Sequence, residues 1–134
     1  MDTGIELVKE WLDAMNERNV NRMSSVCSED AVGDEVADPP PAQGRDRIAK
    51  SYKELFEGFP DCNAEILNIF GSQNQVLAEV RWKGTNKGAF RGTPATGKLV
   101  DIRIAYIFKI KNKKICKITE YYDGATVTAQ MGLS

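Results

Sequence analysis

The residues best suited to chemistry lie at the end of the most regular stretch of the chain. Residues 114–123 read as a strand, and Asp123 is its last residue. Strict alternation places Asp123 on the same side of that strand as Ile115 and Tyr121. A carboxylate at the rim of an apolar sheet face is a candidate acid or base, and the Tyr121 hydroxyl could donate to a developing oxyanion. We therefore take Asp123 and Tyr121 as candidate catalytic residues. The alternative is that Asp123 caps a helix that follows it.

The residue types that are missing narrow the chemistry further. The chain has no histidine, which excludes Ser-His-Asp and Cys-His machinery and the usual histidine metal sites. Cys27, Cys62 and Cys116 are widely spaced without a Cys-x-x-Cys pair, so we expect neither a disulfide framework nor a metal site. Acid–base chemistry must therefore use Asp, Glu, Tyr, Lys or Cys.

Length and composition indicate one globular domain over residues 1–134. Hydrophobic residues make up 42% and charged residues 28% of the chain, which is typical of a folded rather than a disordered sequence. The net charge is −1 and the basic residues are scattered, so we expect no nucleic-acid partner and no membrane surface. The sequence shows neither an apolar run of membrane-spanning length nor a cleavable signal pattern, and we expect a cytoplasmic protein.

Hydrophobic periodicity predicts both helices and strands. We expect helices at 2–18, 20–26, 44–59 and 125–131, and strands at 31–36, 62–70, 76–85, 99–110 and 114–123. Residues 86–97, with three glycines and one proline, are expected to form a loop. Sequential strands joined by short turns should pair antiparallel. The order predicts an α+β fold in which helices cover the concave face of a strongly curved antiparallel sheet and enclose a tapering cavity.

Large apolar and aromatic side chains would line that cavity and contact a hydrophobic small molecule. The expected ligand-binding residues are Trp82, Phe56, Phe59, Tyr52, Tyr106, Trp11, Met15 and Phe90. The alternative is that these side chains simply fill the core, with the tyrosine hydroxyls reaching water. Asp34 and Glu35 could reach the cavity mouth, although adjacent residues of a strand face opposite ways.

Apolar residues also occur on the other face of the predicted sheet. Cys116 and Ile118 alternate with the inward residues of the last strand, as Ala105 and Ile107 do in the strand before it. Apolar residues on both faces indicate that the outer face is covered too. We expect a two-fold homodimer through this convex face. Ordinary scattered surface apolarity is the alternative.

Four ordered segments of the chain resemble the SnoaL-like polyketide cyclases, which lie within the superfamily of NTF2-like folds. The segments are 44–48 leading into Phe-Pro-Asp at 59–61, Val-Arg-Trp-Lys-Gly-Thr at 80–85, the glycine-containing 88–97, and 114–123 running on to Gln-Met-Gly at 130–132. The resemblance implies a cystatin-like, cone-shaped α+β barrel and usually a homodimer. It also implies an intramolecular aldol ring closure on a polyketide ester, without metal or cofactor. In such members an aspartate near the end of the last strand is the acid–base group, and Asp123 is the position that best matches.

The chain departs from the family pattern where that pattern carries histidine. Lys117-Ile118-Thr119 stands in place of a common Glu-His-Trp, and Gly84-Thr85-Asn86 in place of Gly-Thr-His. Three functions remain open: a cofactor-free lyase or isomerase of the ester-cyclase type acting on a hydrophobic carbonyl compound, a non-catalytic ligand-binding module, and a dimeric interaction domain with a filled cavity. The resemblance favours the first function, and the missing histidines favour the second.

Overall fold

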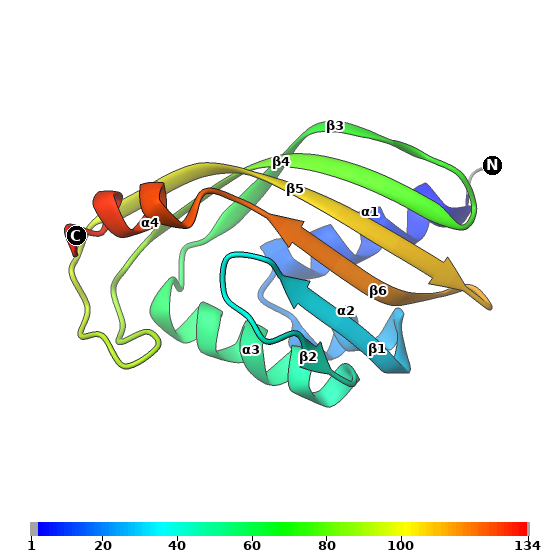
Figure 1. Ribbon diagram of the computed structural model, residues 1–134, viewed down its shortest axis with the longest axis horizontal. Coiled ribbons are helices and arrows are strands. Elements are labelled where there is room, and N and C mark those ends of the chain that lie inside the picture. The colour runs from blue at the N-terminus through cyan, green and yellow to red at the C-terminus, as the bar shows by residue number, and fades with distance from the viewer. Residues whose placement is uncertain (1–2, 134) are drawn as a thin grey trace.

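The computed structural model describes residues 3–133 and has the α+β fold expected from the sequence (Figure 1). The helices are α1 (Thr3–Asn16), α2 (Val20–Ser25), α3 (Arg45–Gly58) and α4 (Gly124–Gln130). The strands are β1 (Cys27–Glu35), β2 (Ala42–Gln43), β3 (Asn63–Gly71), β4 (Gln75–Thr85), β5 (Leu99–Lys111) and β6 (Lys114–Tyr121). Each expected element is present with its ends moved by a few residues. Asp2, where the first helix was expected to begin, lies outside the described residues.

The strands form one sheet in the order β2-β1-β6-β5-β4-β3. The expected antiparallel meander is confirmed in β3 to β6, where each strand pairs with the next one along the chain. β1 runs parallel to β6, which makes the sheet mixed. A parallel pair needs a long crossover rather than a turn, so its partner strand cannot be read from neighbouring turn signals. Here the whole segment from α3 to β5 separates the two strands.

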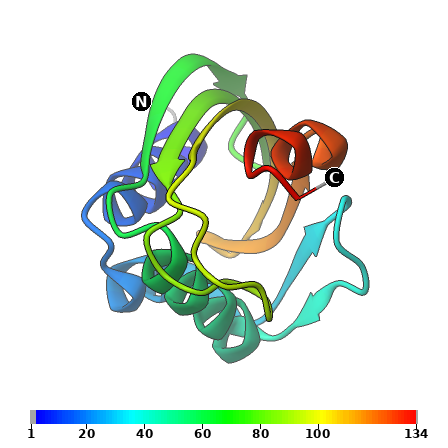
Figure 2. The same ribbon diagram turned by 90° about the vertical axis from the view of Figure 1, so that its left-hand side faces the viewer.

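The sheet curls strongly, and α1 and α3 lie across its concave side (Figure 2). α1 has its apolar residues at helical spacing, and Val8, Trp11, Leu12 and Met15 are all buried against the sheet. In α3 the buried residues are Ile48 and the last residue of the helix, Gly58. Within residues 3–133, no helix is long and apolar enough to cross a membrane.

An irregularity in β6 decides which of its side chains face the concave side. The pairing with β5 shifts by one residue between Lys109 and Ile110, so Cys116 is an extra residue of β6. Such a β-bulge reverses the alternation of the residues that follow it. Ile115 and Ile118 are consequently both buried, although they lie three positions apart. The expected faces of Ile118 and of the residues after it are therefore wrong.

Candidate active site

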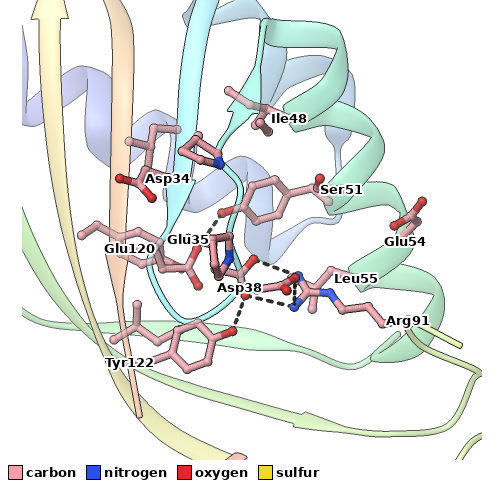
Figure 3. A pocket seen from close by; sticks show the side chains of 18 of the residues that line it. Asp34, Glu35, Asp38, Ile48, Ser51, Glu54, Leu55, Arg91, Glu120 and Tyr122 are labelled. Atoms are coloured by element: carbon pink, nitrogen blue, oxygen red, sulfur yellow. Dashed lines mark hydrogen bonds and ion pairs between the residues drawn. The ribbon is translucent and has the colours of Figure 1, made fainter. Parts of the chain in front are cut away.

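A cavity of about 800 Å³ opens between the concave face of the sheet, α3 and residues 86–97. This volume falls within the range of sites that hold a small organic molecule. Its apolar lining includes Phe59, Trp82, Val100, Ile104 and Ile118, and its polar lining includes Glu35, Tyr52, Arg91, Glu120 and Tyr122. Figure 3 shows the Arg91 guanidinium beside the carboxyl groups of Glu35 and Asp38, and the Tyr122 hydroxyl directed at Glu35.

The sheet places three polar side chains in one row across neighbouring strands. Glu35 of β1 is the register partner of Glu120 in β6, and Glu120 is in turn the partner of Tyr106 in β5. All three side chains line the cavity. Side chains directly opposite each other on one face of a sheet interact, and like charges in that position repel. The row therefore puts two carboxyl groups beside each other and a tyrosine beside one of them.

Glu35 is fixed by three hydrogen bonds. Arg91 Nη1 and Nη2 donate to its two carboxylate oxygens at 3.1 and 2.8 Å, and the Tyr122 hydroxyl donates to its Oε2. The Arg91 guanidinium also pairs with Asp38 at 2.9 Å. A planar guanidinium suits such two-pronged contact with a carboxylate. Burial, together with the hydrogen bond to Glu35, raises the pKa of Tyr122, so its hydroxyl remains a donor.

Glu120 has a different environment, although it stands next to Glu35. Among the described residues, its carboxyl group accepts one hydrogen bond, from the Tyr52 hydroxyl, which lies 3.4 Å from Oε1. Burial, and secondarily the negative charge of Glu35, raises the pKa of Glu120 to about 8. The hydrogen bond from Tyr52 and the positive charge of Arg91 act in the opposite direction and are outweighed. Glu120 is therefore mostly protonated at neutral pH.

These two carboxyl groups have the asymmetry that acid–base catalysis needs. A carboxyl group with a pKa close to the working pH can take up a proton and return it. The Glu35 carboxylate beside it, which Arg91 holds in place, contributes to the raised pKa of Glu120. Strongly shifted titrating groups inside a cavity are typical of functional sites. No group of three or more acidic or cysteine side chains within residues 3–133 is placed to hold a metal ion.

Residues 86–97 bring Arg91 to the cavity. The Asn86 side chain is fully buried; its amide donates to Gly58 O at 3.3 Å, and its carbonyl oxygen accepts from Thr96 N at 2.8 Å. These bonds tie both ends of the segment to the end of α3. Between them, Phe90 and Arg91 reach the cavity lining. Asn86 therefore has a structural role at the position where the family pattern carries histidine.

The structure divides the expected ligand-binding residues into two groups. Those that line the cavity are Trp82, Phe59, Tyr52, Tyr106 and Phe90. Trp11, Met15 and Phe56 are not part of the lining. Trp11 and Met15 are fully buried, and Trp11 packs edge-on against Tyr52 and Tyr106, at 5.3 and 5.5 Å between ring centroids. For these three residues the structure shows the alternative role, which is core packing behind the lining.

The expected position of Asp123 and Tyr121 on the inner face is wrong. The bulge in β6 turns Tyr121 outward, where it pairs with Ala105 and is 47% exposed. Asp123 is exposed and caps α4, accepting hydrogen bonds from Ala125 N at 3.0 Å and Thr126 N at 3.3 Å. A further hydrogen bond from the Thr126 hydroxyl is the main cause of the lowered pKa of Asp123, and the two backbone bonds contribute to it. The structure therefore shows Asp123 in the capping role and gives its catalytic role no geometric support.

Glu120 and Arg91 are not among the site residues predicted from the sequence. Both are single charged residues without a local motif around them, and strict alternation from Ile115 would put Glu120 on the outer face. One signal was available. Ile115 and Ile118 cannot share one face of a regular strand, so two large apolar residues at that spacing indicate a bulge. A bulge at that point turns Glu120 inward in place of Tyr121.

Comparison with known proteins defines the class of this protein. The sequence profile of the SnoaL-like polyketide cyclases matches residues 5–131. Because this match spans nearly the whole chain, the protein belongs to the SnoaL-like polyketide cyclase family. A comparison with curated proteins gave no significant match.

Solved structures agree with this assignment at the level of the fold. A candidate SnoaL-like polyketide cyclase from Jannaschia sp. CCS1 has a TM-score of 0.89 and 18% identity, over 98% of this chain and 93% of that chain. A candidate polyketide cyclase from Xanthomonas campestris pv. campestris has a TM-score of 0.88 and 20% identity, over 96% of each chain. A protein with a ketosteroid isomerase-like fold from Catenulispora acidiphila, solved with trimethylamine, has a TM-score of 0.82 and 21% identity, over 96% of this chain and 94% of that chain.

Proposed function

We propose that this protein catalyses a cofactor-free acid–base reaction on a hydrophobic carbonyl compound, of the ester-cyclase type, with Glu120 as the proton acceptor and donor. The observation that carries the proposal is the place of Glu120. It lines an apolar cavity beside Glu35, and its pKa is raised to about 8. Such a carboxyl group is ionised in part at neutral pH and is a stronger base than an ordinary glutamate.

The proposed reaction balances without a further reactant. The Glu120 carboxylate takes a proton from the carbon next to a carbonyl group, and the electron pair of the broken C–H bond forms an enolate. The enolate carbon then bonds to a second carbonyl carbon of the same molecule, which closes a ring. The oxygen of that second carbonyl becomes an alkoxide and takes the proton back from Glu120. Arg91 holds the Glu35 carboxylate in place beside Glu120 throughout.

The test is proton exchange between aryl ketones or β-keto esters and D2O, followed by proton NMR. We expect the wild-type protein to accelerate exchange of the α-protons and Glu120→Gln to abolish the acceleration. Asp123→Asn is the matched control, because Asp123 lies outside the cavity lining and Asn also caps helices. Loss of exchange in Asp123→Asn with full exchange in Glu120→Gln would refute the assignment of Glu120.

A non-catalytic ligand-binding module is the second candidate function. It is favoured by the protonation of Glu120 at neutral pH, since a protonated carboxyl group donates a hydrogen bond to a ligand oxygen. This function predicts tight binding of carbonyl compounds without α-proton exchange in the wild-type protein.

We also propose a homodimer through the convex face of the sheet. Leu77, Ala105 and Ile107 are register partners or neighbours on that face, and all three are partly exposed in the single chain. Tyr121 extends the same face and is 47% exposed. A second copy of the chain would cover these side chains by two-fold symmetry.

A further inference from the structure

The cavity contains one tyrosine hydroxyl that no described residue satisfies. Three tyrosines line the cavity. The Tyr52 hydroxyl donates to Glu120 and the Tyr122 hydroxyl donates to Glu35. The Tyr106 side chain is only 1% exposed, yet within residues 3–133 its hydroxyl makes no hydrogen bond. Among the described residues, Trp11 Nε1 is the fully buried polar side-chain atom without a partner, so the Tyr106 hydroxyl is not sealed in the core. It belongs to a residue of the cavity lining and is free to donate a hydrogen bond to a ligand oxygen there.

The Tyr106 ring is held rigidly. It packs against Trp11 at 5.5 Å and against Phe108 at 5.6 Å between ring centroids. Its register partner on the β4 side is Ala78, which is too small to reach the hydroxyl. Side chains of a strand stand roughly perpendicular to the sheet, so the hydroxyl is the ring atom farthest from the strand. A donor fixed in this way needs no rearrangement when a ligand oxygen arrives.

The surroundings keep this hydroxyl protonated. Burial is the main cause that raises the pKa of Tyr106 well above its ordinary value, and the negative charges of Glu120 and Glu35 raise it further. Tyr106 therefore remains a hydrogen-bond donor over the whole working range of pH. Its cross-strand neighbour Glu120 exchanges a proton in the proposed function. The two groups lie on the same face of the sheet, one beside the other.

We propose that the Tyr106 hydroxyl is the hydrogen-bond donor for the carbonyl oxygen of the substrate, at the carbonyl whose α-proton Glu120 removes. This inference rests on the proposed function and specifies its substrate. The substrate is a flat, neutral ketone or ester whose carbonyl oxygen meets Tyr106 while its α-carbon meets Glu120. When Glu120 takes the α-proton, the electron pair of the C–H bond moves onto the carbonyl oxygen. Tyr106 stabilises that oxygen by donating a hydrogen bond and keeps its own proton.

The experiment uses 2-acetylnaphthalene as the probe, because its carbonyl oxygen accepts hydrogen bonds and cannot donate them. 2-Ethylnaphthalene is the matched probe without oxygen. Affinities are measured by fluorescence titration of the wild-type protein, Tyr106→Phe and Tyr52→Phe. The carbonyl stretching frequency of the bound ketone is measured by infrared difference spectroscopy. Thermal unfolding of each variant shows whether it is folded.

We expect Tyr106→Phe to bind 2-acetylnaphthalene roughly 3- to 10-fold more weakly than the wild-type protein, as for the loss of one hydrogen bond. Its affinity for 2-ethylnaphthalene should not change. The carbonyl frequency should be lowered in the wild-type protein and in Tyr52→Phe, and should return toward that of the free ketone in Tyr106→Phe. The melting temperature of Tyr106→Phe should equal that of the wild-type protein, because the removed hydroxyl has no protein partner.

Two results would overturn the inference. An unchanged carbonyl frequency in Tyr106→Phe, with or without a lower melting temperature, means that the hydroxyl does not contact the ligand. A water bridge to Trp11 Nε1, which is buried without a partner among the described residues, would give this result. This result would not affect the proposed role of Glu120 in proton exchange, which is tested separately. If the wild-type protein binds neither probe, the cavity does not take such ligands, and both the inference and the proposed function are refuted.

Discussion

The raised pKa of Glu120 has a direct consequence for stability. The group titrates at 4.5 in its ordinary state and at about 8 in the folded chain. Between these values the folded chain holds a proton that the unfolded chain releases, so the free energy of unfolding falls as the pH rises. Each unit of pKa difference is worth about 1.4 kcal/mol, which gives an upper limit of about 5 kcal/mol for ionising Glu120 in place. Water in the cavity weakens the effect, and we expect a loss of about 2 to 5 kcal/mol.

Glu120→Gln isolates this contribution. Glutamine resembles the protonated glutamate in shape and carries no charge at any pH. Urea unfolding followed by tryptophan fluorescence at pH 5.5, 7 and 9 gives the free energy of unfolding of both proteins. Because the unfolded chain releases this proton above pH 4.5, we expect the variant to be more stable than the wild-type protein by about 1 kcal/mol at pH 5.5 and by about 2 to 5 kcal/mol at pH 9. The other titrating groups cancel in the comparison.

Asp123→Asn provides the control. The pKa of Asp123 is lowered by the hydrogen bonds of the α4 cap, so its contribution to stability is lost only as the pH falls through the acid range. Its difference from the wild-type protein should therefore be constant between pH 5.5 and 9. A difference between the wild-type protein and Glu120→Gln that is equally constant would refute the reasoning, because Glu120 would then be ionised throughout.

Three further outcomes are expected from single substitutions. Asp123→Ala should lower the melting temperature through the loss of the α4 cap, while the carboxyl-carbon NMR titration of Glu120 stays unchanged; a shifted titration would contradict the separation of the two sites. Arg91→Met should raise the apparent pKa of Glu120, because Arg91 is a positive charge that lowers it. A lower or equal pKa would contradict this electrostatic effect of Arg91 on Glu120. Ile107→Asp should convert the proposed dimer to a monomer in analytical ultracentrifugation, and a wild-type protein that sediments as a monomer would refute the dimer.

The helices and strands of the fold could be predicted from the sequence because local hydrophobic patterns indicate them. Period-two alternation marks β4 and β5, and helical spacing marks α1 and α3, since each pattern shows which side of an element is buried. The cavity-lining roles of Trp82 and Tyr106 follow from the same alternation, because both strands are regular there. The parallel pairing of β1 with β6 could not be predicted in this way, as no turn connects the two strands.

The sequence predicted candidate site residues at the end of the last strand, and the structure places Glu120 and Tyr122 of that region in the cavity lining. One extra residue in β6, Cys116, exchanges the two faces beyond it, so Glu120 takes the place expected for Tyr121. Asp123 lies just beyond the strand and caps the next helix instead. A bulge depends on how two strands twist and pair, which a single strand's sequence indicates only weakly.

The sequence by itself determined the elements, the α+β class and the aromatic walls, because burial imposes a periodicity on each segment separately. It also restricted the chemistry to carboxyl and hydroxyl groups, since the chain has no histidine. Only the tertiary structure decided which carboxyl group has a strongly raised pKa. The pKa of Glu120 depends on burial by α3 and the sheet, on Glu35 from β1 and on Arg91 from the segment before β5. These groups are remote along the chain and adjacent in space, and electrostatic interactions depend on distance in space alone.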